Sequence, residues 1–154
     1  MGRGESGLPR EPNIWVVDTS ILVGYLRAGS YGEFLRREIP RGGVFLPGVV
    51  LYELQAGTTT RGDRADVETL RRALGTKIVG TVADDWVLAG RCLAKYAERW
   101  GRVRPRDHLA DTLVAVTAAR LNATVASEDV RGMARWAWTL RRLGADIRVE
   151  AITS

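Results

Sequence analysis

Cysteine and histidine are almost missing from this sequence, which contains one of each, Cys92 and His108. A single cysteine excludes an intramolecular disulfide and a zinc site built from several thiolates. A single histidine excludes a multi-histidine metal site and makes any Ser-His-Asp arrangement depend on His108 alone. The groups that remain for chemistry are carboxylates, hydroxyls and arginines.

Long apolar runs are also missing. The longest apolar stretch, around residues 42–52, is interrupted by Pro47, whereas a membrane-spanning helix needs about 20 apolar residues. Residues 1–12 are rich in Gly, Arg and Pro and contain no apolar core of a signal peptide. We therefore expect a cytoplasmic protein without membrane association, with residues 1–12 as a flexible tail and residues 13–154 as one domain.

Lysine is scarce although the chain is basic. Of 23 Lys and Arg residues, only Lys77 and Lys95 are lysines, and 18 acidic residues leave a formal net charge of +5. Arginine offers a planar fork of donors that suits phosphate, so this charge favours a polyanionic partner such as nucleic acid. A surface that is simply solvated is the alternative. The densest basic segment runs from Arg91 through Lys95 and Arg99 to three loop arginines, Arg102, Arg104 and Arg106.

Short apolar runs alternate with helical periodicity along the chain. The predicted strands lie at residues 14–17, 44–46, 77–81, 123–126 and 147–149. The predicted helices lie at residues 21–26, 31–35, 47–57, 65–74, 84–100, 108–121 and 128–143, with residues 58–63 as a polar loop and Ser127 as the cap of the last helix. This alternation indicates an α/β domain with a parallel sheet.

Acidic residues recur where ligands bind in such folds, near the carboxyl ends of the strands. Asp18 ends the first predicted strand, Asp129 follows the fourth, and Glu53 and Asp111 interrupt apolar helices. Converging carboxylates repel one another, and Mg²⁺ or Mn²⁺ would relieve that repulsion without His or Cys ligands. Two such ions are a common device for phosphodiester hydrolysis.

Each carboxylate also has a structural interpretation. Asp18 could cap a helix, Glu53 could be a surface residue, and Asp111 and Asp129 could be first-turn acids favoured by the helix dipole. Asp107, which would share a helix face with Asp111, and Glu128, beside Asp129, are further candidates for the site.

Four segments together resemble PIN-domain ribonucleases, in particular the VapC toxins of toxin–antitoxin pairs. The segments are residues 17–20 (VDTS), 46–54 (LPGVVLYEL), 109–115 (LADTLVA) and 123–129 (ATVASED). The resemblance implies a three-layer α/β/α fold with a central parallel sheet of four to five strands. It also implies an acidic quartet of Asp18, Glu53, Asp111 and Asp129 that binds Mg²⁺ or Mn²⁺, with Ser20, Ser127 and Thr19 orienting the ligands.

The function implied by the resemblance is metal-dependent endoribonuclease activity, with RNA as the substrate, a homodimer as the assembly and a small VapB-like antitoxin as the inhibitor. The chain departs from the family pattern at Gly132-Met133, where a further Asp-Phe pair is often found. A catalytically weak PIN-fold module that binds RNA or antitoxin is the alternative. Trp136 lies on an apolar helical stripe and is predicted to be core, whereas Trp138 lies off it and could contact a partner or a base, or be packed.

Overall fold

The computed structural model describes residues 13–153, so the predicted tail at residues 1–12 lies outside the described residues. In chain order the elements are β1 (Trp15–Val17), α1 (Thr19–Ala28), α2 (Gly32–Glu38), β2 (Val44–Pro47), α3 (Gly48–Ala56), α4 (Arg61–Leu74), β3 (Ile78–Val79), α5 (Ala83–Trp100), α6 (Leu109–Leu121), β4 (Thr124–Ala126), α7 (Val130–Arg142) and β5 (Arg148–Glu150). Short 3₁₀ turns, Gly75–Lys77 and Pro105–His108, precede β3 and α6.

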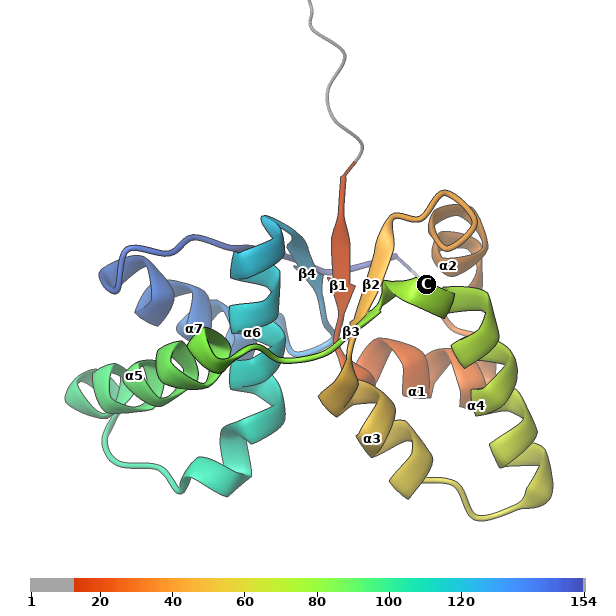
Figure 1. The fold of residues 1–154 in the computed structure, drawn as a ribbon, viewed down its shortest axis with the longest axis horizontal. Coiled ribbons are helices and arrows are strands. Elements are labelled where there is room, and N and C mark those ends of the chain that lie inside the picture. Colours follow the sequence, from red (N-terminus) through yellow and green to blue (C-terminus); the bar gives the residue numbers. More distant parts are fainter. Residues whose placement is uncertain (1–12, 154) are drawn as a thin grey trace, which may run out of the picture.

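The five strands form one sheet in the order β3-β2-β1-β4-β5, and every neighbouring pair is parallel. Helices α1–α4 lie on one side of the sheet and α5–α7 on the other (Figure 1). This distribution follows from right-handed crossovers, because the chain winds outward from β1 through β2 to β3 and then returns to build β4 and β5 beyond β1. The predicted three-layer α/β/α fold is confirmed.

The central strands are short and apolar because both faces of the sheet are covered. Val16, Val17 and Val125 are fully buried, and the α6 residues Val114 and Val116 pack into the same core. Strands buried on both faces appear in the sequence as continuous apolar runs, which is how β1 could be predicted. Cys92 is buried, as expected for a core thiol, and burial raises its pKa to about 11.

The direction of winding reverses between β1 and β4, so the carboxyl ends of these two strands open onto the switch point of the sheet. The register places Val17 opposite Ala126. The residues that follow each strand, Asp18 and Ser127, are therefore neighbours, although more than a hundred residues separate them in the chain.

Residues 58–60 form a polar loop as predicted, but helix α4 already begins at Arg61, so the predicted loop at residues 58–63 is too long. The Thr60 hydroxyl accepts a hydrogen bond from the Asp63 N–H, and the Asp63 carboxylate accepts one from the Thr60 N–H. This reciprocal capping box satisfies amide groups at the start of the helix and allows it to begin within a polar sequence.

The cap of α7 is Asp129 and not Ser127, and the helix begins at Val130. Ser127 is instead fully buried and turned toward Asp18. Likewise α6 begins at Leu109, after a 3₁₀ turn, so Asp107 and Asp111 do not share the α-helical face that the sequence predicted. Among residues 13–153, no helix combines the length and apolar character that spanning a membrane would require.

Candidate functional site

Asp18 occupies the end of β1 and is 8% exposed. Its Oδ1 accepts a hydrogen bond of 2.7 Å from the Thr19 N–H and so caps α1. Its Oδ2 accepts one of 2.8 Å from the buried Ser127 hydroxyl. Both carboxylate oxygens are thus oriented, and each keeps a lone pair because an ionised carboxylate has about four acceptor positions.

Ser127 links the ends of β1 and β4. While it donates to Asp18, its oxygen accepts a hydrogen bond of 3.1 Å from the Asp129 N–H. The Asp129 Oδ1 in turn accepts one of 2.9 Å from the Gly132 N–H at the first turn of α7. One hydroxyl therefore positions two of the predicted acids.

Glu53 lies on α3, which follows β2, and is half-buried. Its Oε1 accepts a hydrogen bond of 2.9 Å from the Thr19 hydroxyl. Because Thr19 is adjacent to Asp18, this bond brings the third acid toward the end of β1. Thr19 and Ser127 thus contact the candidate acids directly.

Asp111 lies in the first turn of α6 and is half-buried. Burial, together with the negative charge of Asp18 and smaller contributions from Asp129 and Glu53, raises the pKa of this carboxyl to about 6, and His108 partly opposes the rise. All three other predicted acids therefore act electrostatically on Asp111. The fold brings the four carboxylates, two of which follow β1 and β4 and two of which lie on α3 and at the start of α6, into one electronegative region.

This set of oxygen donors fits a hard divalent cation in its chemistry, since Mg²⁺ and Mn²⁺ prefer carboxylate ligands. Within residues 13–153, however, no three His, Cys, Asp or Glu side chains are arranged in a group that could hold a metal ion. The carboxylates instead bind hydrogen-bond donors of the protein, as the contacts of Asp18, Glu53 and Asp129 demonstrate.

The two further acids point elsewhere. Asp107 is bound by Arg104 at 3.1 Å and is approached by Arg106 at 3.9 Å. Glu128 accepts a hydrogen bond of 2.7 Å from the Tyr31 hydroxyl. The pKa of Asp111 responds to the charges of Asp18, Asp129 and Glu53, whereas Asp107 and Glu128 are engaged by Arg104 and Tyr31.

The three loop arginines are exposed in the structure. Two of them, Arg104 and Arg106, share Asp107, which reduces the positive charge that the loop presents. The turn that carries Asp107 leads directly into α6 and Asp111. The basic loop is therefore next to the acidic region in the sequence, because it leads into the helix that carries Asp111.

Ser20 and Tyr31 connect the β4–α7 loop to the first two helices, which could not be predicted from the sequence. Ser20 accepts a hydrogen bond of 3.1 Å from the Glu128 N–H, and Tyr31, at a positive φ of 63°, holds the Glu128 side chain. These contacts hold the β4–α7 loop against α1 and the start of α2. The unusual backbone conformation of Tyr31 cannot be recognised from the sequence.

The fold and the acidic region define an α/β domain with a carboxylate cluster at the switch point of a parallel sheet. The sequence profile described as PIN domain matches residues 15–138. The chain therefore belongs to the PIN domain family, and the resemblance seen in the sequence is confirmed at that level.

Solved structures with the same fold come from toxin–antitoxin complexes. VapBC2 from Rickettsia felis, bound to a DNA fragment from the promoter, has 19% identity and a TM-score of 0.67, covering 90% of this chain and 98% of the other. DNA-bound VapBC from Salmonella typhimurium has 17% identity and a TM-score of 0.67, covering 91% and 98%. VapBC-5 from Mycobacterium tuberculosis has 21% identity and a TM-score of 0.54, covering 93% and 100%. No curated protein sequence matches the chain.

Proposed function

We propose that this protein is a metal-dependent endoribonuclease that acts as the toxin of a VapBC-type pair. The observation that carries the proposal is the gathering of four carboxylates at the switch point of the sheet, where Ser127 links Asp18 to Asp129 and Thr19 binds Glu53. Burial and the charges of the other three acids raise the pKa of the fourth, Asp111, to about 6. Burying several carboxylates together costs free energy, and such clusters are typical of functional sites. A bound divalent cation would offset the repulsion between their charges.

In this proposal Asp18, Glu53, Asp111 and Asp129 would hold one or two Mg²⁺ or Mn²⁺ ions. The chemistry that such ions supply when bound is activation of water and stabilisation of the oxygen that leaves the phosphorus. The chain's own part is orientation. Ser127 binds both the Asp18 carboxylate and the Asp129 amide, and Thr19 binds Glu53. Ser20 binds the backbone of the β4–α7 loop at Glu128.

The decisive experiment incubates total RNA with the wild type, Asp18→Asn and Asp84→Asn, each with Mn²⁺ or with EDTA. Asp84 is an exposed acid in the first turn of α5 and serves as the matched control. We expect cleavage by the wild type and the control, loss with EDTA, and loss in Asp18→Asn. Full activity of Asp18→Asn would disprove the site.

A thermal melt with Mn²⁺ separates this proposal from the weakly active module. A ligand that binds only the native state raises its stability by mass action. We expect Mn²⁺ to raise the melting temperature of the wild type more than that of Asp18→Asn. Absence of both cleavage and this rise would favour a PIN-fold module that acts only by binding RNA or antitoxin.

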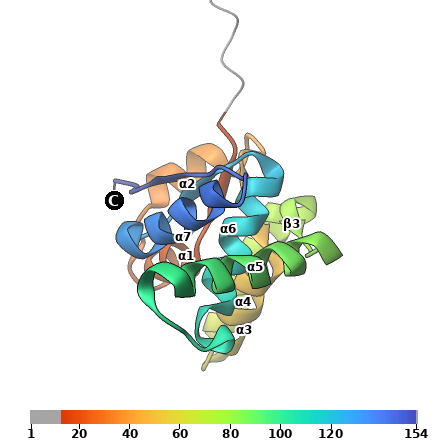
Figure 2. The same cartoon turned by 90° about the vertical axis from the view of Figure 1, so that its left-hand side faces the viewer.

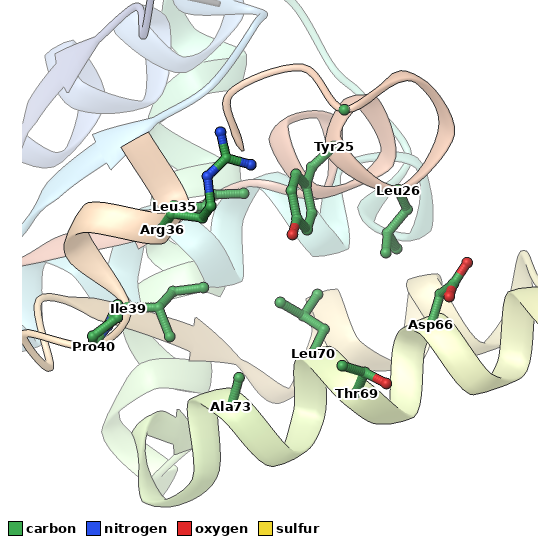
Figure 3. Close-up of a pocket in the computed structure, with 11 residues that line it drawn as sticks. Tyr25, Leu26, Leu35, Arg36, Ile39, Pro40, Asp66, Thr69, Leu70 and Ala73 are labelled. Atoms are coloured by element: carbon green, nitrogen blue, oxygen red, sulfur yellow. The ribbon is translucent and has the colours of Figure 1, made fainter. Parts of the chain in front are cut away.

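An apolar groove offers a place for the antitoxin. A cavity of about 530 Å³ lies between α1, α2 and α4, lined by Tyr25, Leu26, Leu35, Ile39 and Leu70, with Arg36 and Asp66 also in its wall (Figure 3). Leu26 and Asp66 also line a second cavity, which contains Glu53. An antitoxin segment with apolar side chains could fill the first cavity and place a cation near Glu53 in the second.

The antitoxin is tested with the product of the neighbouring gene. Co-expression is expected to suppress growth arrest and to yield a complex that copurifies. Ala73→Arg would place a charge in the groove and is expected to release the toxin from inhibition without loss of cleavage. Ala65→Arg, at an exposed alanine of α4 outside the groove lining, is the control. Inhibition that persists in Ala73→Arg would place the antitoxin elsewhere.

A further inference from the structure

A row of aromatic rings leads away from the helix that carries Asp111. His108 lies 5.6 Å from Trp136, Trp136 stacks on Tyr96 at 4.5 Å, and Tyr96 lies 4.8 Å from Trp100, all between ring centroids. Trp138 meets Trp100 edge to face at 4.9 Å. The row joins the start of α6 to the face formed by α5 and α7, which run close together in Figure 2.

The row changes character along its length. Trp136 and Tyr96 are buried and pack as core, as the helical stripe predicted for Trp136. Trp100 and Trp138 are only half-buried, so one part of each ring system contacts the protein and another part remains open. The open end of the row is formed by residues of α5 and α7.

Arginines cover that open end. The Arg142 guanidinium lies 4.1 Å above the Trp138 ring, and those of Arg135 and Arg99 lie 5.5 and 5.9 Å from the Trp100 ring. All three arginines are exposed. Among the described residues none of the three pairs with a carboxylate, whereas nearby Arg141 pairs with Asp146 and Lys95 with Glu98.

A guanidinium that lies on an indole has one planar face covered and the other free. Unpaired bases stack on aromatic rings and on arginine planes, while the edge of the guanidinium can still donate to phosphate. The combination therefore matches a single nucleic-acid strand, which presents bases and phosphates together. A double helix keeps its bases stacked inside and offers this surface only phosphates.

We propose that Arg142 on Trp138, together with Arg99 and Arg135 around Trp100, forms a base-stacking surface for single-stranded RNA outside the acidic region. The proposal rests on the proposed ribonuclease function, for which this surface would hold a flanking part of the substrate. The row of rings and the Arg102–Arg106 loop connect the surface to the helix of Asp111. The Arg142 guanidinium over the Trp138 ring supplies base contact, and the three charges supply phosphate contact.

The test measures binding of a fluorescein-labelled oligoadenylate to the full chain in EDTA, where cleavage is not expected. An abasic oligomer of equal charge and a duplex of equal length are the companion probes. Arg142→Lys keeps the charge and removes the plane, whereas Arg142→Gln removes both. Arg64→Lys and Arg64→Gln, at an exposed arginine of α4 on the other side of the sheet, are the matched controls.

We expect Arg142→Lys to weaken binding of the oligoadenylate by at least about five-fold, from the typical range of base stacking, and to leave the abasic oligomer unaffected. Arg142→Gln should weaken both probes and reduce the slope of log affinity against log salt by about 0.7. Trp138→Phe should retain binding, because a ring remains beneath the guanidinium. Trp138→Leu, with its fold checked by its melting temperature, should behave like Arg142→Lys.

Equal affinity of wild type and Arg142→Lys for the oligoadenylate would overturn the proposal. So would preference for the duplex, or an equal effect of the Arg64 variants. These outcomes are independent of catalysis. If the wild type cleaves RNA while Arg142→Lys binds normally, the stacking surface is wrong and the nuclease stands. Binding with the expected pattern but no metal-dependent cleavage would contradict the nuclease alone.

Discussion

At the scale of single residues, two of the candidate acids serve the fold as well as the proposed chemistry. Asp18 caps α1, as the sequence allowed, and Asp129 caps α7 in place of Ser127, where the sequence suggested a first-turn acid. Capping and the proposed chemistry are compatible at Asp18. One oxygen caps α1 and the other binds Ser127, and each oxygen keeps a free lone pair. A cap also fixes the carboxylate at the end of its strand.

Neutralising Asp111 should abolish cleavage and stabilise the metal-free protein. Its carboxyl has a pKa of about 6 in the folded chain against 3.8 for the free side chain, so ionisation at neutral pH costs about 1–2 kcal/mol after allowance for solvent screening. The folded pKa is raised, so this cost develops between pH 4 and 6 and persists above pH 6.

The measurement is chemical unfolding of wild type and Asp111→Asn in EDTA across that pH range. The variant should gain stability over the wild type above pH 6 and lose this advantage below pH 4. A variant that is less stable than the wild type at pH 7 would indicate that the carboxylate is held by a favourable contact.

Ser127→Ala should reduce both stability and cleavage. The change removes the hydroxyl that joins Asp18 and the Asp129 amide inside the protein, at an expected cost of about 1–3 kcal/mol for the buried groups left unpaired. Thr139→Ala removes an equally buried hydroxyl, one that binds the Arg135 carbonyl on α7. The control should lose stability and keep cleavage, which separates orientation of the acids from general destabilisation.

At the scale of elements, the predicted and observed structures differ mainly in where the helices begin. The start of α4 depends on the reciprocal bonds of Thr60 and Asp63, and the start of α7 on Asp129. Apolar periodicity locates the middle of a helix, because it reports the buried face. The caps involve polar residues, and several positions in each loop could supply one.

Removal of the α4 cap should destabilise the protein by about 1 kcal/mol in Thr60→Ala. Backbone and side-chain hydrogen bonds from Thr59 and Thr60 hold the pKa of Asp63 at about 2. Because this folded pKa is depressed, its contribution is present above the unfolded value near 4 and is lost as the pH falls through about 2.

Acid unfolding followed by circular dichroism tests this cap. Asp63→Asn should reduce stability at neutral pH and flatten its decline between pH 4 and 2. Asp66→Asn, which removes another carboxylate of α4 outside the capping box, should leave that decline as in the wild type. An unchanged acid transition in Asp63→Asn would show that the cap contributes nothing measurable.

At the scale of the whole molecule, apolar side chains remain exposed on two of the helices that pack against α6. Trp86 and Val87 of α5 are 50% and 59% exposed, and Tyr52 of α3 is 73% exposed. Exposed apolar groups of this size are typical of association surfaces. They support the homodimer expected from the family resemblance, which we propose forms through this side of α5.

Val87→Asp should convert that dimer to monomers, because an unpaired charge would be buried at the interface. Sedimentation velocity at several concentrations measures the change. Ala65→Asp, an exposed alanine of α4, should leave the dimer intact. A wild type that remains monomeric at high concentration, or a Val87→Asp variant that still dimerises, would contradict this interface.

Much of the candidate site could be predicted because acids at strand ends follow from topology. Once parallel strands are recognised, residues after β1 and β4 must meet at one edge of the sheet, and this is where Asp18 and Asp129 lie. The contact of Tyr31 with Glu128, and the ion pairs of Asp107 with Arg104 and Arg106, could not be predicted. Both depend on loop conformations and on partners that have no fixed spacing in the sequence.

The sequence by itself determined the α/β class, the parallel strands and the four acids, because burial and strand ends leave local patterns of apolar and charged residues. Only the tertiary structure decided the role of Ser127, whose position suits a helix cap but whose hydroxyl binds Asp18 across the sheet. It also decided that Trp138 lies beneath Arg142 beside Trp100. Such contacts depend on the register of strands and on the crossing of α5 with α7, which arise when distant segments pack and are written in no single stretch of the chain.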